Sequence, residues 1–288
     1  MTGQVYGAGA RSFLFVPGTR PDRFAKAAAS GADAVILDLE DAVAPQDKAS
    51  ARALVAGHVR DQQQALVRVN GAGTPWFADD LAAFADAGRP AGIVLPKAES
   101  PEQVAEVLTA LGLRVPIFTL IESARGVRDA NLIAQAPGVT RMMFGNLDFA
   151  LDAGITARSA DERELLFARS ALVIASRAAG LPGPVDGVQP DIENDEATRT
   201  AARNAADLGF TGKLCIHPRQ IPPVHSAFEP SADELRWAAR VLELAGDSGG
   251  AAMRLDGEML DAPRLELARR IVGAARKAPA GGKPSEDQ

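Results

Sequence analysis

The sequence predicts an α/β protein built on a (β/α)8 barrel, the fold known as a TIM barrel, with a C-terminal helical and lid extension. Three observations indicate this class. Short apolar runs rich in β-branched residues recur along the chain, each is followed by a segment with helical spacing, and the connections are short. Alternating strands and helices form parallel sheets, and eight such units favour closure into a barrel. A chain of 288 residues with 47% hydrophobic content can bury one such core.

The candidate strands are short, apolar and bounded by polar or turn residues. In chain order they are SFLFVP (12–17), DAVILDLED (33–41), ALVRVN (65–70), GIVLPKA (92–98), PIFTLIES (116–123), RMMFGNLD (141–148), PVDGV (184–188) and GKLCIHP (212–218). Prolines near helix starts and glycines near helix ends bound the helices between them. These residues are Pro21, Pro101, Pro218, Gly88, Gly112 and Gly209.

The pattern changes after the eighth run. A helix is expected from Ser231 to Ala245, because SADE is a capping-box sequence, and another from Pro263 to Arg276 after a glycine-rich break. The predicted organisation has three regions. They are the barrel over residues 1–230, C-terminal helices with a lid segment over 231–277, and a disordered tail over 278–288 that is too polar and rich in Pro and Gly to pack.

Composition excludes several classes of protein. The formal net charge of −6 disfavours nucleic-acid binding, because no basic face is left over for the phosphate backbone. Cys215 is the only cysteine, which excludes an intrachain disulfide and a thiolate metal cluster. The chain starts without a signal-peptide pattern and has no apolar run long enough for a membrane span. We therefore expect a soluble, cytoplasmic protein without a membrane partner.

The reactive groups of such a barrel lie at the C-terminal ends of its strands. The residues expected there are Pro17, Gly18, Glu40, Asp41, Arg68, Asn70, Pro96, Lys97, Glu122, Asp148, Asp186 and His217. Acidic groups outnumber basic ones in this set. Because crowded carboxylates repel one another, the set predicts a bound cation in addition to Arg68.

Glu122 and Asp148 end two consecutive strands, so their carboxylates can converge on one ion. Two carboxylates with open positions for water or substrate oxygens suit Mg²⁺. Zinc would need His or Cys ligands, and only one of the three histidines falls on this face. The alternative is that each carboxylate caps the helix that follows it.

Arg68, the acidic residues after the second strand and His217 also have alternative interpretations. Arg68 lies inside an apolar strand, where it pairs with a structural carboxylate or binds a substrate carboxylate or oxyanion. Asp38 and Glu40 share one face of their strand and should point into the barrel mouth, whereas Asp41 could serve only as a cap. His217, before Pro218, is more typical of a buried, hydrogen-bonded histidine than of a general base.

The segment VPGTRPDRFAKA combines a turn at Gly18 with Arg20, Arg23 and Lys26 at a helix start. Backbone N–H groups, the helix dipole and these cations together suit a phosphate-bearing ligand. A solvated helix face is the alternative for each charge.

These strand ends resemble the citrate lyase β-subunit-like family of Mg²⁺-dependent acyl-CoA lyases. The similarity spans residues 11 to 263 in family order. The matching motifs are RSFLFVPG from Arg11, LDLEDAV from Leu37, RVN from Arg68, LPKAE from Leu95, IES from Ile121, FGNLD from Phe144, GFTGKLCIHPRQI from Gly209 and DGEMLDAP from Asp256.

The resemblance implies a TIM barrel that cleaves or forms a 3-hydroxyacyl-CoA, such as malyl-, citramalyl- or citryl-CoA, by Claisen-type chemistry. Cleavage yields an acyl-CoA and a 2-oxo acid, and the reverse reaction joins them. By motif, Glu122 and Asp148 hold Mg²⁺, Arg68 supports the thioester enolate, and Asp261 is the catalytic acid or base, supplied from a C-terminal lid that belongs to a neighbouring subunit in some relatives. Glu40 and Asp41 match acidic residues beside the metal. Residues expected to bind substrate or CoA are Arg68, Pro17, Gly18, Arg20, Lys26, Gly145 and Asn146.

Two other functions remain open. A CoA-independent pyruvate-type aldolase is less favoured, because relatives of that type use a histidine near the second strand end, where this chain has LDLEDAV. A non-catalytic CoA-binding protein, or a subunit of a citrate lyase complex, is the second alternative. The family resemblance also implies a homo-oligomer, either a trimer or a hexamer.

Overall fold

The computed structural model describes residues 5–61, 64–112, 115–156, 159, 161–247 and 253–277. The predicted disordered tail, 278–288, and most of the predicted glycine-rich break lie outside these residues. The chain divides into two compact units, Met1–Phe228 and Glu229–Gln288, and each is considered by itself below.

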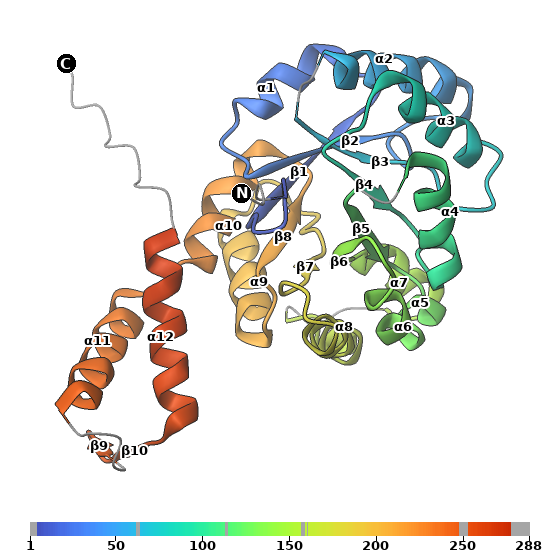
Figure 1. Cartoon of the computed structure of the whole chain (residues 1–288). Helices are drawn as coiled ribbons and strands as arrows, with labels where there is room; N and C mark the ends of the chain where they lie inside the picture. Colours follow the sequence, from blue (N-terminus) through green and yellow to red (C-terminus); the bar gives the residue numbers. More distant parts are fainter. Residues whose placement is uncertain are drawn as a thin grey trace, which may run out of the picture. The chain divides into compact units, whose positions relative to one another are not determined.

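The first unit is a closed barrel of parallel strands in chain order, which confirms the predicted fold class (Figure 1). Its strands are β1 (Ser12–Pro17), β2 (Ala34–Asp38), β3 (Leu66–Arg68), β4 (Gly92–Leu95), β5 (Ile117–Ile121), β6 (Val139–Phe144), β7 (Val185–Asp186) and β8 (Gly212–Cys215). β1 also pairs with β8, which closes the sheet. Each predicted run contains one strand, but the polar residues at the ends of the runs belong to the loops that follow.

Helices connect successive strands and surround the barrel (Figure 1). They are α1 (Phe24–Ala28), α2 (Lys48–Arg60), α3 (Phe77–Ala87), α4 (Pro101–Leu111), α5 (Ala124–Arg128), α6 (Ala130–Ala134), α7 (Asn146–Asp152), α8 (Leu166–Ala178), α9 (Asp195–Leu208) and α10 (Ile221–Phe228). The 3-10 turns are η1 (Pro21–Arg23), η2 (Pro45–Asp47), η3 (Arg163–Leu165) and η4 (Pro218–Gln220). Local sequence sets their boundaries. Ser100 and Gln103 form a capping box at the start of α4, and Gly209 ends α9 in a left-handed conformation.

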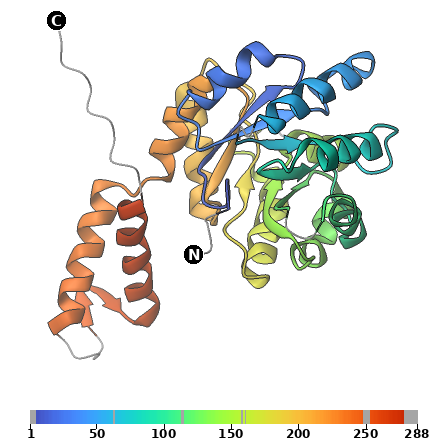
Figure 2. The same cartoon turned by 45° about the horizontal axis from the view of Figure 1, so that its top comes forward.

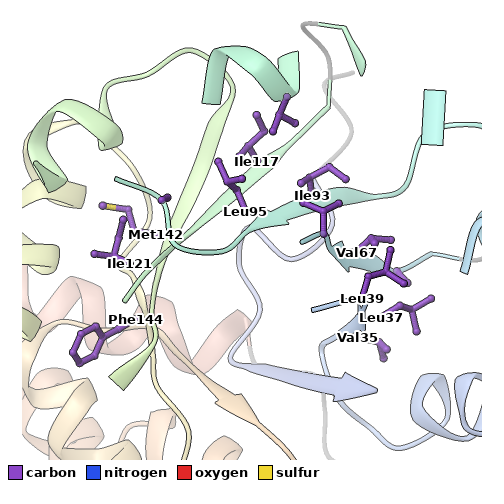
Figure 3. Packing of buried hydrophobic residues seen from close by; sticks show 14 of the residues in the cluster. Val35, Leu37, Leu39, Val67, Ile93, Leu95, Ile117, Ile121, Met142 and Phe144 are labelled. Carbon is purple, nitrogen blue, oxygen red and sulfur yellow. The ribbon is translucent and has the colours of Figure 1, made fainter. Parts of the chain in front are cut away.

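Alternate residues of each strand face two different apolar layers. The inner layer fills the barrel with side chains that include Phe13, Ile36, Leu66, Phe118 and Met143. The outer layer joins the strands to the helices. Figure 3 shows part of it, including Val35, Leu37, Val67, Ile93, Leu95, Ile117, Ile121, Met142 and Phe144. Because both layers are closely filled, the strand ends are held in fixed positions.

The second unit is a helical hairpin with a small β-hairpin at one end, and α11 and α12 lie side by side (Figure 2). Its elements are α11 (Ala232–Asp247), β9 (Met253–Leu255), β10 (Glu258–Leu260) and α12 (Ala262–Lys277). Ser231 and Glu234 form the predicted capping box, with N–H to side-chain oxygen distances of 2.7 and 3.1 Å. The β-hairpin was not predicted. Among the described helices of both units, none combines the length and apolar character needed to cross a membrane.

Candidate functional site

Arg68 and Asp38 form the inner wall of the barrel mouth, the end at which the strands finish. They stand opposite each other in the β2–β3 register. The guanidinium donates two hydrogen bonds to the Asp38 carboxylate, from Nε at 2.7 Å and from Nη2 at 2.6 Å. The Phe15 ring centroid lies 4.7 Å from the guanidinium carbon. Burial lowers the pKa of Arg68, but the carboxylates of Asp38, Glu40 and Asp41 raise it by more, so the guanidinium stays charged. The structural-pairing interpretation of Arg68 is therefore confirmed, and a role toward substrate is compatible with it.

Glu40 follows β2 and points into the same mouth, as its shared face with Asp38 predicted. Two hydrogen bonds of 2.7 Å from the ammonium of Lys48 to the carbonyls of Leu39 and Glu40 fix the backbone there. The Glu40 carboxylate lies 2.6 Å from Lys97 Nζ and 3.1 Å from Arg68 Nη1. The contact with Arg68 is made by Oε2, which is buried and, apart from this ion pair, receives no hydrogen bond from any described residue. Burial is the main cause that raises the pKa of Glu40, followed by repulsion from Asp41.

Lys97 is the residue of this site whose role the sequence interpretation missed. It follows β4 in a left-handed conformation, with φ at +48°, which is unusual for a residue other than glycine. This conformation directs its N–H to Glu122 Oε1 at 2.7 Å, while its ammonium reaches Glu40 and lies 3.9 Å from Glu122. Nearby carboxylates raise the pKa of Lys97 against the effect of burial. A signal was present, because one arginine could not balance so many predicted carboxylates.

Glu122 follows β5 and is 3% exposed. Burial, repulsion from Glu40 and repulsion from Asp148 raise its pKa to about 8, despite the opposing effect of Lys97 and Arg68. The capping alternative is wrong for this residue, because Ser123 caps α5 by accepting a hydrogen bond from the Gly126 N–H. Gly145 lies directly against the Glu122 carboxylate, since a Cβ at position 145 would collide with Oε2.

Asp148 does not end a strand but stands in the first turn of α7, whose N-cap is Gly145. Its carboxylate is half-buried and is near enough to Glu122 to raise the pKa of that residue. The capping alternative is wrong for Asp148 too, because Gly145 is the N-cap of α7 and no side-chain cap hydrogen bond forms there, although the helix dipole favours a carboxylate in this first turn. The same position brings its charge into the mouth.

The site has more negative than positive charge. Asp38, Glu40, Asp41, Glu122 and Asp148 gather here, and Arg68 and Lys97 form ion pairs with members of this group. Burial lowers the pKa of Lys48, but Asp38, Glu40 and Asp41 oppose this effect, so the Lys48 ammonium adds a third positive charge and five carboxyl groups meet three cations. We call the five acidic residues together with Arg68 and Lys97 the mouth cluster. Within the described ranges, no group of three or more His, Cys, Asp or Glu side chains is arranged so that it could hold a metal ion, so a site here would rest on two carboxylates. The excess of carboxylates and the oxygen-only donors fit a hard cation that keeps open positions, such as Mg²⁺.

Three residues expected at the mouth have other surroundings. Asp186 points outward from the barrel, where it forms a buried ion cluster with Arg169 at 2.8 Å and Lys213 at 2.6 Å. Asn70 bonds to Asp80 of α3. The prediction of a buried His217 is wrong. Its ring is exposed and accepts a hydrogen bond from the Arg219 N–H as the cap of η4.

The residues proposed for substrate or CoA differ in how they are held. Gly18 packs against the Asp38 carbonyl, since an added Cβ would lie only 2.8 Å from that oxygen. Pro17 ends β1, Arg20 is exposed and paired with Asp22, and Lys26 is exposed on α1. Asn146 is buried and hydrogen-bonded to the Val188 backbone.

Asp261 belongs to the second unit. It precedes α12, and its carboxylate accepts a hydrogen bond from the Arg264 N–H at 3.1 Å. The side chain is exposed. Asp261 thus acts as a helix cap in this chain, a role that the sequence interpretation did not consider.

Comparisons with known proteins agree with the geometry. A family model described as HpcH/HpaI aldolase/citrate lyase matches residues 11–218. A citrate lyase subunit beta-like protein of Mycobacterium tuberculosis (strain CDC 1551 / Oshkosh) is 40% identical over 270 residues, covering 92% of this chain and 96% of that protein. A (3S)-malyl-CoA thioesterase of Cereibacter sphaeroides (strain ATCC 17029 / ATH 2.4.9) is 34% identical over 272 residues, covering 92% and 94%. The crystal structure of protein CitE from M. tuberculosis in complex with magnesium, acetoacetate and coenzyme A has a TM-score of 0.83 and 38% identity, covering 94% of this chain and all of that one.

Proposed function

Since the chain belongs to the HpcH/HpaI aldolase/citrate lyase family, we propose that it is a Mg²⁺-dependent carbon–carbon lyase acting on a 3-hydroxyacyl-CoA. Malyl-, citramalyl- and citryl-CoA are the candidate substrates, and an acyl-CoA and a 2-oxo acid are the products. The observation that carries the proposal is the pair of carboxylates, Glu122 and Asp148, in a mouth where acidic groups outnumber the cations that pair with them. The magnesium, acetoacetate and coenzyme A bound by the similar CitE structure support it.

Glu122 and Asp148 would hold the ion. When bound, Mg²⁺ supplies positive charge next to the carboxylate and carbonyl oxygens of the 2-oxo acid. Glu40 and Asp41 would complete its surroundings, and Lys97 would keep Glu122 oriented through its backbone N–H. Each of these side chains is attached near a strand end, so the site is rigid before substrate arrives.

Arg68 would stabilise the charge that develops on the thioester oxygen when the carbon–carbon bond breaks. Its bidentate pairing with Asp38 fixes the guanidinium in one orientation, and its raised pKa keeps it charged. A fixed charge in a water-poor site lowers such a barrier without reorganisation, typically by several kcal/mol. Asp38 therefore acts through Arg68.

Asp261 would give or take the proton at the acyl α-carbon. Its side chain is exposed on the second unit, where the carboxylate accepts the hydrogen bond from the Arg264 N–H. The DGEMLDAP motif supports this role, and the segment around Asp261 would serve as a lid. Some relatives supply this residue from a neighbouring subunit, so the proposal includes a homotrimer or hexamer.

CoA would bind at the first βα loop, with Pro17, Gly18, Arg20 and Lys26 near its phosphates and Gly145 near the thioester. The excess negative charge of the mouth cluster makes cations outside that cluster necessary for a ligand with several phosphates. Charge reversal at Lys26 or Arg20 should raise the KM for acyl-CoA without affecting the KM for the 2-oxo acid.

Incubation of the purified protein with malyl-, citramalyl- and citryl-CoA, with Mg²⁺ or with EDTA, tests the proposal. Mass spectrometry should detect an acyl-CoA and a 2-oxo acid only in the presence of Mg²⁺, and Glu122→Gln should abolish both products. Absence of turnover with all three, in both directions, would refute the lyase.

One alternative activity is supported by a particular relative, the (3S)-malyl-CoA thioesterase. Hydrolysis would release free CoA and the intact hydroxy acid, so the same product analysis separates it from the lyase. Turnover of free hydroxy-oxo acids without CoA would instead identify a pyruvate-type aldolase. CoA binding without any turnover would identify a non-catalytic subunit.

A further inference from the structure

The seam between β6 and β7 is the least paired of the barrel. Five residue pairs set the β5–β6 register, but a single pair, Met143 with Val185, sets the β6–β7 register. Asp148 lies just after β6, in the first turn of α7. A carboxylate placed beyond a poorly paired strand end needs some other support if it is to keep a fixed position.

The side chain of Asn146 provides that support. Its Nδ2 donates to the Val188 carbonyl at 3.1 Å, and the Val188 N–H donates to its Oδ1 at 3.0 Å. Asn146 and Val188 each stand three residues beyond the paired Met143 and Val185. The amide therefore extends the β6–β7 ladder with two bonds, in the place of a main-chain peptide group.

The segment that follows β7 leaves room for this amide. A Cβ on Gly187 would overlap Oδ1 and Cγ of Asn146. The backbone of Gly187 is not in the left-handed region, so conformational freedom is not the reason for glycine at this position. Glycine is required there because the amide occupies the space that a side chain would fill. Asn146 is correspondingly 1% exposed.

A chain of polar side chains, buried at Asn146, Arg169 and Asp186 and half-buried at Glu162, continues from the same amide. Asn146 Nδ2 lies 3.5 Å from Glu162, which receives a hydrogen bond from Arg169 at 2.6 Å. Arg169 bonds in turn to Asp186 of β7 at 2.8 Å. The N-terminus of α7 is thus connected to β7 both through the backbone of Val188 and through charged side chains.

We propose that Asn146 and Gly187 are positioning residues that act through Asp148, fixing the first turn of α7 so that its carboxylate meets the Glu122 carboxylate at one ion. This role differs from the substrate contact that the sequence predicted for Asn146. The inference rests on the proposed metal site and deepens it.

Titration of the full-length protein with Mn²⁺, followed by electron paramagnetic resonance of the free ion, tests this inference apart from catalysis. Asn146→Ala and Gly187→Ala should each weaken Mn²⁺ binding by about 10- to 100-fold, the range typical of groups that orient metal ligands. Two matched controls should bind as the wild type does. Asn194→Ala removes the side-chain cap of α9, and Gly57→Ala adds a Cβ with no atom within 4 Å.

The outcomes are distinct. If the wild type binds no Mn²⁺, the metal site and the proposed function fail, and the inference fails with them. If the wild type binds Mn²⁺ and the Asn146 and Gly187 variants bind it equally well, only the inference is overturned. If one variant does not fold, the other decides, with Mn²⁺-induced thermal stabilisation as a second readout for a marginally folded protein.

Discussion

The two ends of the barrel both bury charge, but they treat it differently. At the N-terminal end, the fully buried Arg141 guanidinium donates to the carbonyls of Gly183, Ala10 and Gly7 and to the Thr211 hydroxyl, at 2.6 to 3.3 Å. At the C-terminal end, the mouth cluster has more carboxylates than cations, and Glu40 Oε2, apart from its ion pair with Arg68, receives no hydrogen bond from the described residues.

This difference separates stability from function. Burial lowers the pKa of Arg141, but each of its three nitrogens donates a hydrogen bond within the chain, and these bonds hold the charge. The mouth is incomplete within the chain, and burial raises the pKa of Glu122 to about 8. A buried cluster in which carboxylates outnumber cations indicates a ligand, whereas a buried charge whose hydrogen bonds are made within the chain indicates structure.

The largest expected effect is at the mouth. Glu122→Gln and Asp148→Asn should each lower kcat/KM by about 10³-fold or more, equivalent to ~4 kcal/mol of transition-state stabilisation, because each removes a proposed metal ligand. The melting temperature of the metal-free protein should not fall at neutral pH, since Asp148→Asn removes a charge from a repulsive cluster and Glu122→Gln replaces a side chain that stays protonated below a pKa of about 8. Steady-state kinetics and calorimetry measure both quantities. A stability loss that matches the activity loss would place the mouth in the same class as the Arg141 end.

The second largest effect on activity is expected at Asp261, which belongs to neither end of the barrel. Asp261→Asn should lower kcat by about 10²-fold or more while KM changes little, because the acid is lost and the α12 cap is kept. Asp261→Ala loses the cap as well and should also destabilise the second unit by about 1 kcal/mol. A change confined to KM would show that Asp261 only holds substrate.

At the N-terminal end of the barrel we expect the opposite result, a loss of stability without a loss of activity. Arg141→Met should reduce the free energy of unfolding by about 3 kcal/mol, because several buried acceptors lose their donor. The kcat of the folded protein should stay as in the wild type. Urea unfolding with parallel kinetics tests this, and a selective loss of activity with unchanged stability would contradict the assignment.

The pH dependence of stability and of Mg²⁺ affinity tests whether the mouth carboxylates lack the charge balance of a purely structural site. The ordinary pKa of Glu122 is 4.5, and the folded protein raises it to about 8. Between these values the unfolded chain has released a proton that the folded chain keeps, so Glu122 makes metal-free stability fall as pH rises. Mg²⁺ affinity should rise over the same window, because the ion competes with that proton. Melting curves in EDTA from pH 4.5 to 8 should differ between the wild type and Glu122→Gln in this direction; parallel curves would mean that Glu122 has an ordinary pKa.

The smallest expected effect concerns the room beside Glu122. Gly145→Ala should weaken Mg²⁺ binding by about tenfold, because the added methyl group displaces Oε2 of Glu122. Stability should change by less than the ~1.4 kcal/mol that corresponds to this factor. Isothermal titration measures the affinity, and unchanged binding would show that the carboxylate has another position available.

Sequence periodicity was sufficient for the fold, because eight alternating units leave few topologies. It also placed Glu40, Arg68, Glu122 and Asp148 at one end, since every parallel strand finishes there. It did not give the direction of Asp186, because PVDGV is too short to show which residue faces inward. The interior position of Val185 leaves Asp186 facing outward, toward Lys213.

Other features depended on contacts that no local pattern encodes. The pairing of Lys97 with Glu40 crosses from the fourth strand to the second, and the Asn146–Val188 bonds cross a seam between strands. The hairpin of β9 and β10, in contrast, could have been predicted. Asp256 and Gly257 both have positive φ, and Asp-Gly between apolar runs is a strong signal for a hairpin turn.

The most direct test of the account is the position of a metal ion in a crystal of this protein soaked with Mn²⁺ and a 2-oxo acid. We expect one strong anomalous peak at the barrel mouth, at about 2.1 Å from carboxylate oxygens of both Glu122 and Asp148. A peak bound elsewhere, or a mouth that stays without metal at saturating Mn²⁺, would contradict the central claim that these two carboxylates share an ion.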